Sequence, residues 1–169
     1  MPHPLVVQLR FTRSEFKRAL LGFSDADAHR RVPPMNCISW NIGHLAWQEQ
    51  LNWLTRMQGQ TPLPQLNELV GYEQAACTPP LAEMWTAWHT VTQLVDPFLD
   101  TLTTQKLQEV VHIDEEQRVY TPGVVLQRII YHYWYHLGEN MAIRQMLGHT
   151  DLPEFVGDIE AEAPYLPHF

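Results

Sequence analysis

The stretch at residues 125–147, "VLQRIIYHYWYHLGENMAIRQML", predicts one long helix that carries two polar rings on its apolar face. The inward stripe, with steps of three and four residues, contains Val125, Ile129, His132, His136, Glu139 and Ile143. This spacing places side chains on one face of an α-helix. Thr121 and Pro122 suit its start, as N-cap and first helical residue, and Gly148 suits its end. Two histidines and a carboxylate therefore take positions that usually face a core.

Three further segments show helical periodicity, at residues 5–21, 36–58 and 81–102. Asn36 is the expected N-cap of the second segment, and Leu51 and Leu54 fall on its inward stripe. Pro97 predicts a kink or local break in the third. Four long amphipathic helices in one chain predict an all-α protein built as a four-helix bundle.

The connections add detail to this fold. Residues 59–80 are long for a link between antiparallel neighbours, and they predict a crossover that lets the second and third helices run parallel. Apolar residues alternate around the polar turn "DEEQ" at 114–117, a pattern compatible with a small β-hairpin. We expect residues 1–150 to form the bundle, and residues 151–169 to form an irregular tail packed on the same domain.

Composition excludes several classes of function. The chain has 169 residues and a net charge of −8, and its 11 Lys and Arg form no run, which argues against nucleic-acid binding. No stretch of 18 apolar residues and no basic-then-apolar leader is present, so we expect a cytoplasmic protein without a membrane span. Cys37 and Cys77 do not form a paired motif and are interpreted as core residues.

The histidines on the inward stripes are the candidate metal ligands. His132 and His136 stand four residues apart, and His44 lies on the inward stripe of the second helix. Imidazoles at this spacing lie one above the other, so they can share one metal ion, and a third from a facing helix completes the set. Three nitrogen ligands suit Zn, Ni, Fe or Co. The alternative is three hydrogen-bonded core histidines, which the residues alone leave open.

Several neighbours of these histidines are candidates for supporting roles. Gln48 follows His44 by one turn, and Asn140 follows His136 by four residues, so both are expected to surround the ligands. Glu139 can act as a catalytic base, orient an imidazole, or pair with Arg144.

Aromatic side chains flank the same positions. Trp40, Trp47 and Tyr133 are expected to form the walls of a pocket beside the metal, although core packing explains them equally well.

Two segments, "NCISWNIGHLAWQEQLNWL" at 36–54 and "IIYHYWYHLGENMAIRQMLGH" at 129–149, resemble the signature helices of the DinB-like (DinB/YfiT) superfamily. The resemblance extends over about residues 5–150. It implies an up-down-down-up four-helix bundle with a divalent metal, often Zn or Ni, held by His44, His132 and His136. It also implies a homodimer.

Members of this superfamily include enzymes that use low-molecular-weight thiols. The resemblance therefore implies a metal-dependent enzyme that transfers such a thiol to an electrophilic small molecule through a metal-bound thiolate. Two alternatives remain at this point. One is a hydrolase that uses metal-bound water, and the other is a non-catalytic metal-binding or stress-associated protein.

Overall fold

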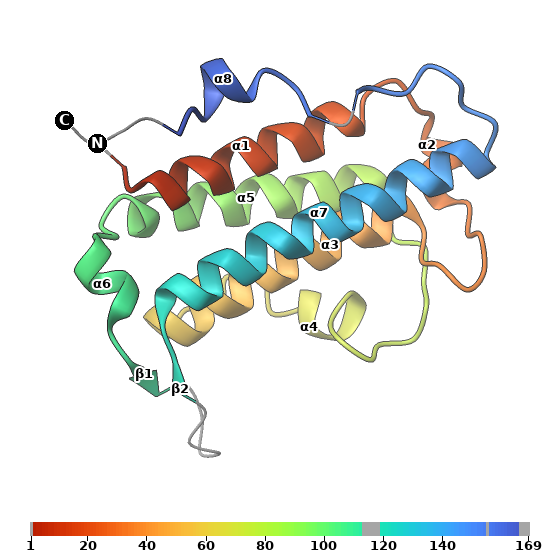
Figure 1. Ribbon diagram of the computed structural model, residues 1–169. Helices are drawn as coiled ribbons and strands as arrows, with labels where there is room; N and C mark the ends of the chain where they lie inside the picture. Colours follow the sequence, from red (N-terminus) through yellow and green to blue (C-terminus); the bar gives the residue numbers. More distant parts are fainter. Residues whose placement is uncertain (1, 113–118, 155, 166–169) are drawn as a thin grey trace.

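The computed structural model describes residues 2–112, 119–154 and 156–165, and it is predominantly helical (Figure 1). The long helical elements are α1 (Pro4–Ala19), α3 (Ile38–Glu49) with its continuation η1 (Gln50–Arg56), α5 (Leu81–Leu99) and α7 (Pro122–Met146). The prediction of an all-α protein is confirmed. None of the helices in the described part of the chain has the length and apolar character needed to cross a membrane.

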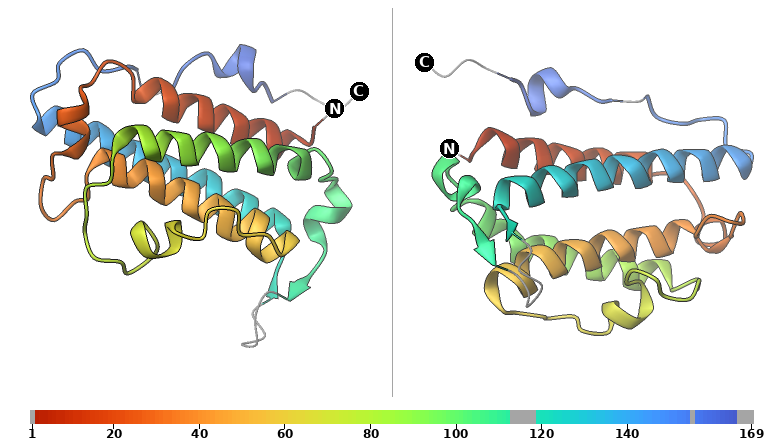
Figure 2. Two further views of the ribbon diagram at one scale, coloured as in Figure 1. Left: turned by 180° about the vertical axis from the view of Figure 1, so that it is seen from behind. Right: turned by 60° about the horizontal axis from the view of Figure 1, so that its bottom comes forward.

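The long helices lie side by side in every view (Figures 1 and 2). In Figure 1, α1 and α7 run from left to right, whereas α3 and α5 run from right to left. The segment between η1 and α5 returns the chain along the length of α3, and it contains the short helix α4 (Leu66–Leu69). Helix α3 packs against both α5 and α7, and α7 packs against α1.

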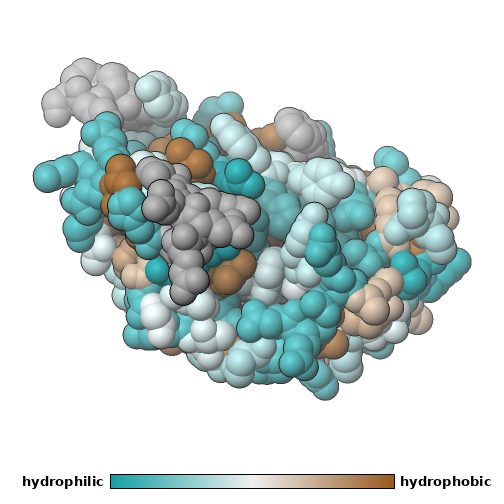
Figure 3. Space-filling view, turned by 90° about the horizontal axis from the view of Figure 1, so that it is seen from below, coloured by the Kyte–Doolittle hydropathy of each residue, from teal (hydrophilic) through white to brown (hydrophobic). Residues whose placement is uncertain are grey.

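Short elements complete the fold. They are α2 (Asp25–His29), α6 (Thr104–Gln108), α8 (Ile159–Glu162), β1 (Val111–His112) and β2 (Val119–Tyr120). Strands β1 and β2 pair antiparallel, with Val111 opposite Tyr120, so the two strands form at the place where the sequence suggested a hairpin. The turn expected at 114–117 lies outside the described residues. The face seen from below is mainly hydrophilic, with hydrophobic residues in small separate groups (Figure 3).

Helix α7 begins and ends at the predicted signals. The hydroxyl of Thr121 accepts a hydrogen bond from the backbone N–H of Val124 at 3.3 Å, and Pro122 is the first helical residue. At the other end, Gly148 has a φ of +89°, in the left-handed region that favours glycine. Local chemistry therefore fixes both ends of the helix that supplies two candidate ligands.

The structure differs from the predicted N-cap of the second long helix, and it excludes a break at Pro97, one of the two alternatives predicted there. The N-cap of α3 is Cys37, which has extended backbone angles, one residue after the predicted Asn36. Helix α5 is not broken at Pro97 but continues through it and ends at Leu99. Since Pro97 stands in the last turn, few helical hydrogen bonds follow it that a break could disrupt.

At the end of the second long helix, the buried residues differ from those that the α-helical period predicted. Residues 50–56 form π-helical turns, in which each turn holds more residues than in an α-helix. Trp53 becomes fully buried there, while the predicted core residue Leu51 is only half-buried. The α-helical period used for the prediction does not apply to this segment.

The tail lies along α1 (Figure 1). The side-chain amide of Gln8 donates to the carbonyl of Ala163 at 2.8 Å, and Glu15 accepts from the backbone N–H of Gly157 at 2.8 Å. The sequence analysis predicted an irregular tail. The tail contains the short helix α8, so this prediction is only partly correct.

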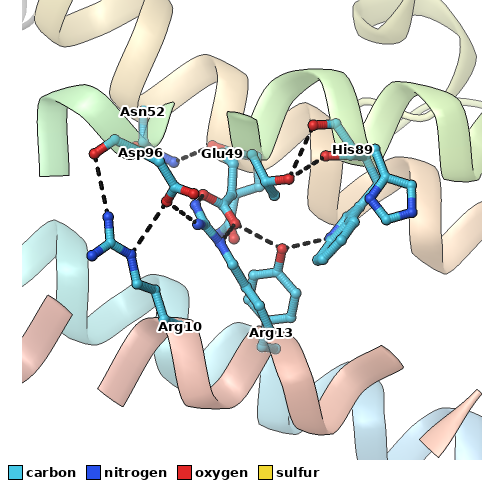
Figure 4. A network of polar contacts seen from close by, with 10 residues as sticks. Arg10, Arg13, Glu49, Asn52, His89 and Asp96 are labelled. Carbon is cyan, nitrogen blue, oxygen red and sulfur yellow. Dashed lines mark hydrogen bonds and ion pairs between the residues drawn. The ribbon is translucent and has the colours of Figure 1, made fainter. Parts of the chain in front are cut away.

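One buried polar network joins all the long helices (Figure 4). Arg13 of α1 forms a salt bridge with Glu49 of α3 and donates to Asp96 of α5 at 2.8 Å. The hydroxyl of Tyr133, on α7, donates to Glu49 at 2.7 Å and accepts from the indole N–H of Trp88 at 2.7 Å. Burial and the nearby Glu49 charge raise the pKa of Tyr133 well above its usual value, so its hydroxyl stays protonated and can donate.

Replacing Arg13 by Met is expected to lower the free energy of unfolding by about 3–5 kcal/mol, because the carboxylate of Glu49 stays buried without its cation. Urea denaturation of the two proteins measures the difference. The matched control is Arg10→Met, which removes partly exposed ion pairs to Asp96 and Asp100 and should cost less than about 1 kcal/mol. Equal losses in the two variants would contradict the central role of the buried pair.

Candidate metal centre

The three histidines predicted from the inward stripes meet between α3 and α7. One ring nitrogen from each of His44, His132 and His136 lies within 4.8 Å of the others. The ring centroid of His44 is 5.1 Å from that of His132 and 5.2 Å from that of His136. His44 and His136 are buried, and His132 is half-buried. The helical period placed these rings inward, and the packing of α3 on α7 brings them together.

Two of the rings are held from behind by hydrogen bonds. Nδ1 of His44 lies 2.7 Å from the carbonyl oxygen of Val70, and Nδ1 of His136 lies 2.8 Å from Oε2 of Glu139. Both partners only accept hydrogen bonds, so both Nδ1 atoms carry the proton. In each neutral ring the lone pair is then on Nε2. Outer hydrogen bonds of this kind orient imidazoles that ligate a metal.

The third ring shows why a cation fits here. Nε2 of His132 lies 3.0 Å from Nε2 of His136, and Nδ1 of His132 is buried without a partner among the described residues. If Nδ1 of His132 carries the proton, two lone pairs face each other; if Nε2 carries it, a buried lone pair on Nδ1 has no donor. A divalent cation accepts lone pairs from both Nε2 atoms, at nitrogen–metal distances of about 2.0–2.1 Å for zinc. The donor set therefore fits a metal ion.

The charge state of the rings suits ligation at neutral pH. Burial, reinforced by the nearby His136, lowers the pKa of His44 to about 4. Burial and the neighbouring histidines lower the pKa of His132 to about 3. Both rings are neutral near pH 7, which is the form that binds metals.

Two of the predicted pocket walls lie beside the site. Trp40 stacks on His44 with ring centroids 4.5 Å apart, and Trp47 stacks on the same ring at 5.1 Å. The structure places Tyr133 elsewhere. Its ring packs edge-on against Phe16 of α1, and its hydroxyl belongs to the buried network around Glu49. Tyr133 follows His132 directly, so it points away from the inward histidine stripe toward α1.

Of the predicted polar neighbours, two are connected to His136 by hydrogen bonds, and one has no hydrogen bond to the histidines among the described residues. Asn41 Nδ2 donates to Glu139 Oε2 at 3.0 Å and to Asn140 Oδ1 at 2.8 Å, so Glu139 contacts His136 directly, whereas Asn140 is linked to it through Asn41 and Glu139. Glu139 touches the outer nitrogen of His136, which favours the orienting alternative for this residue. Gln48 makes no hydrogen bond to the three histidines within the described part of the chain, and its buried Oε1 has no partner there.

The pair suggested between Glu139 and Arg144 does not form among the described contacts. Arg144 instead donates to the carbonyl of Ala19 and to a ring nitrogen of His149.

Two supporting groups were missed from the sequence. Asn41 stands three residues before His44 on the same helix, and this spacing was a usable signal. The carbonyl of Val70 belongs to the crossover after α4, and no side-chain pattern could have indicated a backbone acceptor.

Comparison with known families gives a match over residues 8–139 to the DinB superfamily. The chain therefore belongs to the DinB superfamily, as the two signature segments predicted. A search of curated proteins gave no match.

The purified protein reconstituted with Zn or Ni is expected to hold about one ion per chain, measured by elemental analysis. His132→Ala should bind more than about 100-fold more weakly, since loss of an outer hydrogen bond alone typically costs 10–100-fold. The control is His89→Ala, which changes an exposed histidine on α5. Wild-type protein without stoichiometric metal would refute the assignment of the three histidines.

The metal-free protein is expected to lose stability as the pH falls from about 6.5 toward 4. The folded-state pKa values of His44 and His132 lie below their ordinary value, so the unfolded chain binds more protons in this range. The free energy of unfolding should fall with decreasing pH by up to about 1.4 kcal/mol per pH unit for each of the two histidines. Urea titrations at several pH values measure it, and a shallower slope is expected in a His44→Gln, His132→Gln double variant. An identical slope in that variant would assign the pH dependence to other groups.

Proposed function

We propose that this member of the DinB superfamily is a metal-dependent transferase that joins a low-molecular-weight thiol to an electrophilic small molecule. The observation that carries the proposal is the convergence of three imidazoles, two of them oriented by outer hydrogen bonds. Three protein ligands leave coordination positions open for an exogenous ligand, as catalytic sites require. We propose Zn or Ni as the ion, held by His44, His132 and His136.

A bound divalent ion would supply a lowered pKa for a thiol sulfur, which then reacts as the thiolate. The sulfur has to come from a cosubstrate, because both cysteine thiols of the protein make contacts away from the three histidines. Cys37 is buried beside the hydroxyl of Ser39, and the thiol of Cys77 donates to the carbonyl of Leu69. Burial also raises the pKa of Cys77, which disfavours its thiolate.

The surrounding residues position the ligands and limit access of water. The carbonyl of Val70 and the carboxylate of Glu139 hold the outer nitrogens of His44 and His136, so the inner nitrogens keep one direction. Trp40 and Trp47 cover the ring of His44. Oε2 of Glu139 already accepts two hydrogen bonds, so we assign this residue a positioning role. A hydrolase with Glu139 as its base is less well supported.

We also propose that the fold is the up-down-down-up four-helix bundle of the superfamily and that the protein acts as a cytoplasmic homodimer on small molecules. The directions of the four long helices and the long return segment after η1 support the bundle. The net charge of −8 supports a small-molecule substrate over a nucleic acid.

Protein loaded with Zn or Ni and mixed with a panel of low-molecular-weight thiols and a chlorinated aromatic electrophile is expected to form a thioether, detected by mass spectrometry. Formation should stop on addition of a chelator and in His132→Ala, because both remove the metal, and should persist in His89→Ala. Ester or amide turnover that needs metal but no thiol would favour the hydrolase. Absence of both reactions in metal-replete protein would favour a binding role.

A further inference from the structure

Arg144 is a buried charge that forms no ion pair with a described residue, although the nearby carboxylate of Asp151 partly offsets the lowering of its pKa by burial. Among the described residues the buried charged side chains are Arg13, Glu15, Glu49 and Arg144. The first three each form a salt bridge, to Glu49, Arg18 and Arg13 respectively. Arg144 is 3% exposed, and no carboxylate of a described residue lies within ion-pair distance of it. Buried arginines in proteins are almost always paired, so this position calls for an explanation.

The contacts that Arg144 does make are neutral. Its Nη1 donates to the carbonyl of Ala19 at 2.5 Å, and its Nε donates to Nδ1 of His149 at 3.2 Å. The guanidinium carbon lies 5.9 Å from the ring centre of Phe23. Because Nδ1 of His149 accepts, Nε2 carries the proton of the neutral ring and faces Asp27 at 3.4 Å. These contacts fix the guanidinium in place, but Nη2 has no hydrogen-bond partner among the described residues.

The guanidinium lies at the wall of a cavity of about 560 Å³. The cavity lies where α1 and α7 end and the tail begins, the right-hand end of the molecule in Figure 1. Arg18, Thr150 and Asp151 also line it, and none of the three metal-site histidines does. Its volume falls in the range of small-molecule sites. Arg18 is already paired with Glu15, whereas Arg144 forms no ion pair within the described part of the chain and has there only the electrostatic interaction with Asp151 at the same wall.

We propose that this cavity binds the oxyanion group, carboxylate or phosphate, of a small molecule, with Arg144 as its counter-ion. A planar guanidinium pairs with either group through parallel hydrogen bonds, and the low dielectric around a buried arginine strengthens that pair. Thr150, a residue with a hydroxyl group, also lines the cavity. None of the three histidines lines the site, and an anion there would pair with a buried cation that forms no ion pair among the described residues and has only the nearby Asp151 carboxylate to offset its charge.

The test uses the full-length, metal-loaded protein, with inorganic phosphate and acetate as separate probes at constant ionic strength set by sodium chloride. Thermal unfolding should shift upward with probe concentration in wild type, because a ligand that binds only the folded state stabilises it. In Arg144→Met the affinity should fall more than about tenfold, in line with loss of a charge-assisted pair. Arg128→Met, which removes an exposed arginine from the same helix, should behave as wild type. The probe that acts identifies the oxyanion.

Two results would overturn the proposal. One is equal stabilisation of all three proteins, which indicates a general salt effect, and the other is no stabilisation by either probe. Amide NMR shifts of wild type provide a second measurement that does not depend on the folding of the variant. Binding predicts probe-dependent shifts concentrated at residues 148–151, and shifts spread over the surface would contradict it.

Discussion

The ion pair between Arg13 and Glu49 is the contact on which the arrangement of the long helices depends. Two charges removed from water stabilise a fold only when each is fully paired and hydrogen-bonded. Here Glu49 receives Arg13 from α1 and the hydroxyl of Tyr133 from α7, while Arg13 also reaches Asp96 on α5 (Figure 4). Any rotation of one helix would leave a buried charge unpaired. The network therefore selects one mutual orientation of four helices that apolar packing alone specifies less sharply.

The same network positions the three histidines of the candidate metal centre. Glu49 follows His44 on the second long helix by five residues, and Tyr133 follows His132 directly on α7. The hydrogen bond between Tyr133 and Glu49 thus fixes the two helices close to the point where their histidines meet. A metal site needs its ligands placed to within a few tenths of an ångström. The buried pair and the outer hydrogen bonds to Val70 and Glu139 supply that constraint together.

Helix α7 serves different neighbours with different faces. His132 and His136 meet His44 of α3, whereas Tyr133 and Arg144 turn toward α1. The face toward α3 carries the imidazole lone pairs of His132 and His136, which suit a cation. The face toward α1 carries the buried guanidinium of Arg144, which suits an anion. Two sites of opposite charge thus lie on one rigid helix, and a ligand at the second site would not compete with ligands at the first.

The sequence by itself determined the long helices, the ends of α7 and the inward position of His44, His132 and His136. These features depend on local chemistry and on the helical period, which a single chain segment already contains. Family membership followed from the same two segments.

Only the tertiary structure decided which inward groups meet. The acceptor for His44 is a backbone carbonyl in the crossover, Tyr133 belongs to the buried network rather than to a pocket wall, and the π-helical turns shift Trp53 inward. Each of these depends on how helices rotate and pack against one another. That choice is set by side chains far apart in the sequence, such as Arg13 and Glu49, and no local pattern records it.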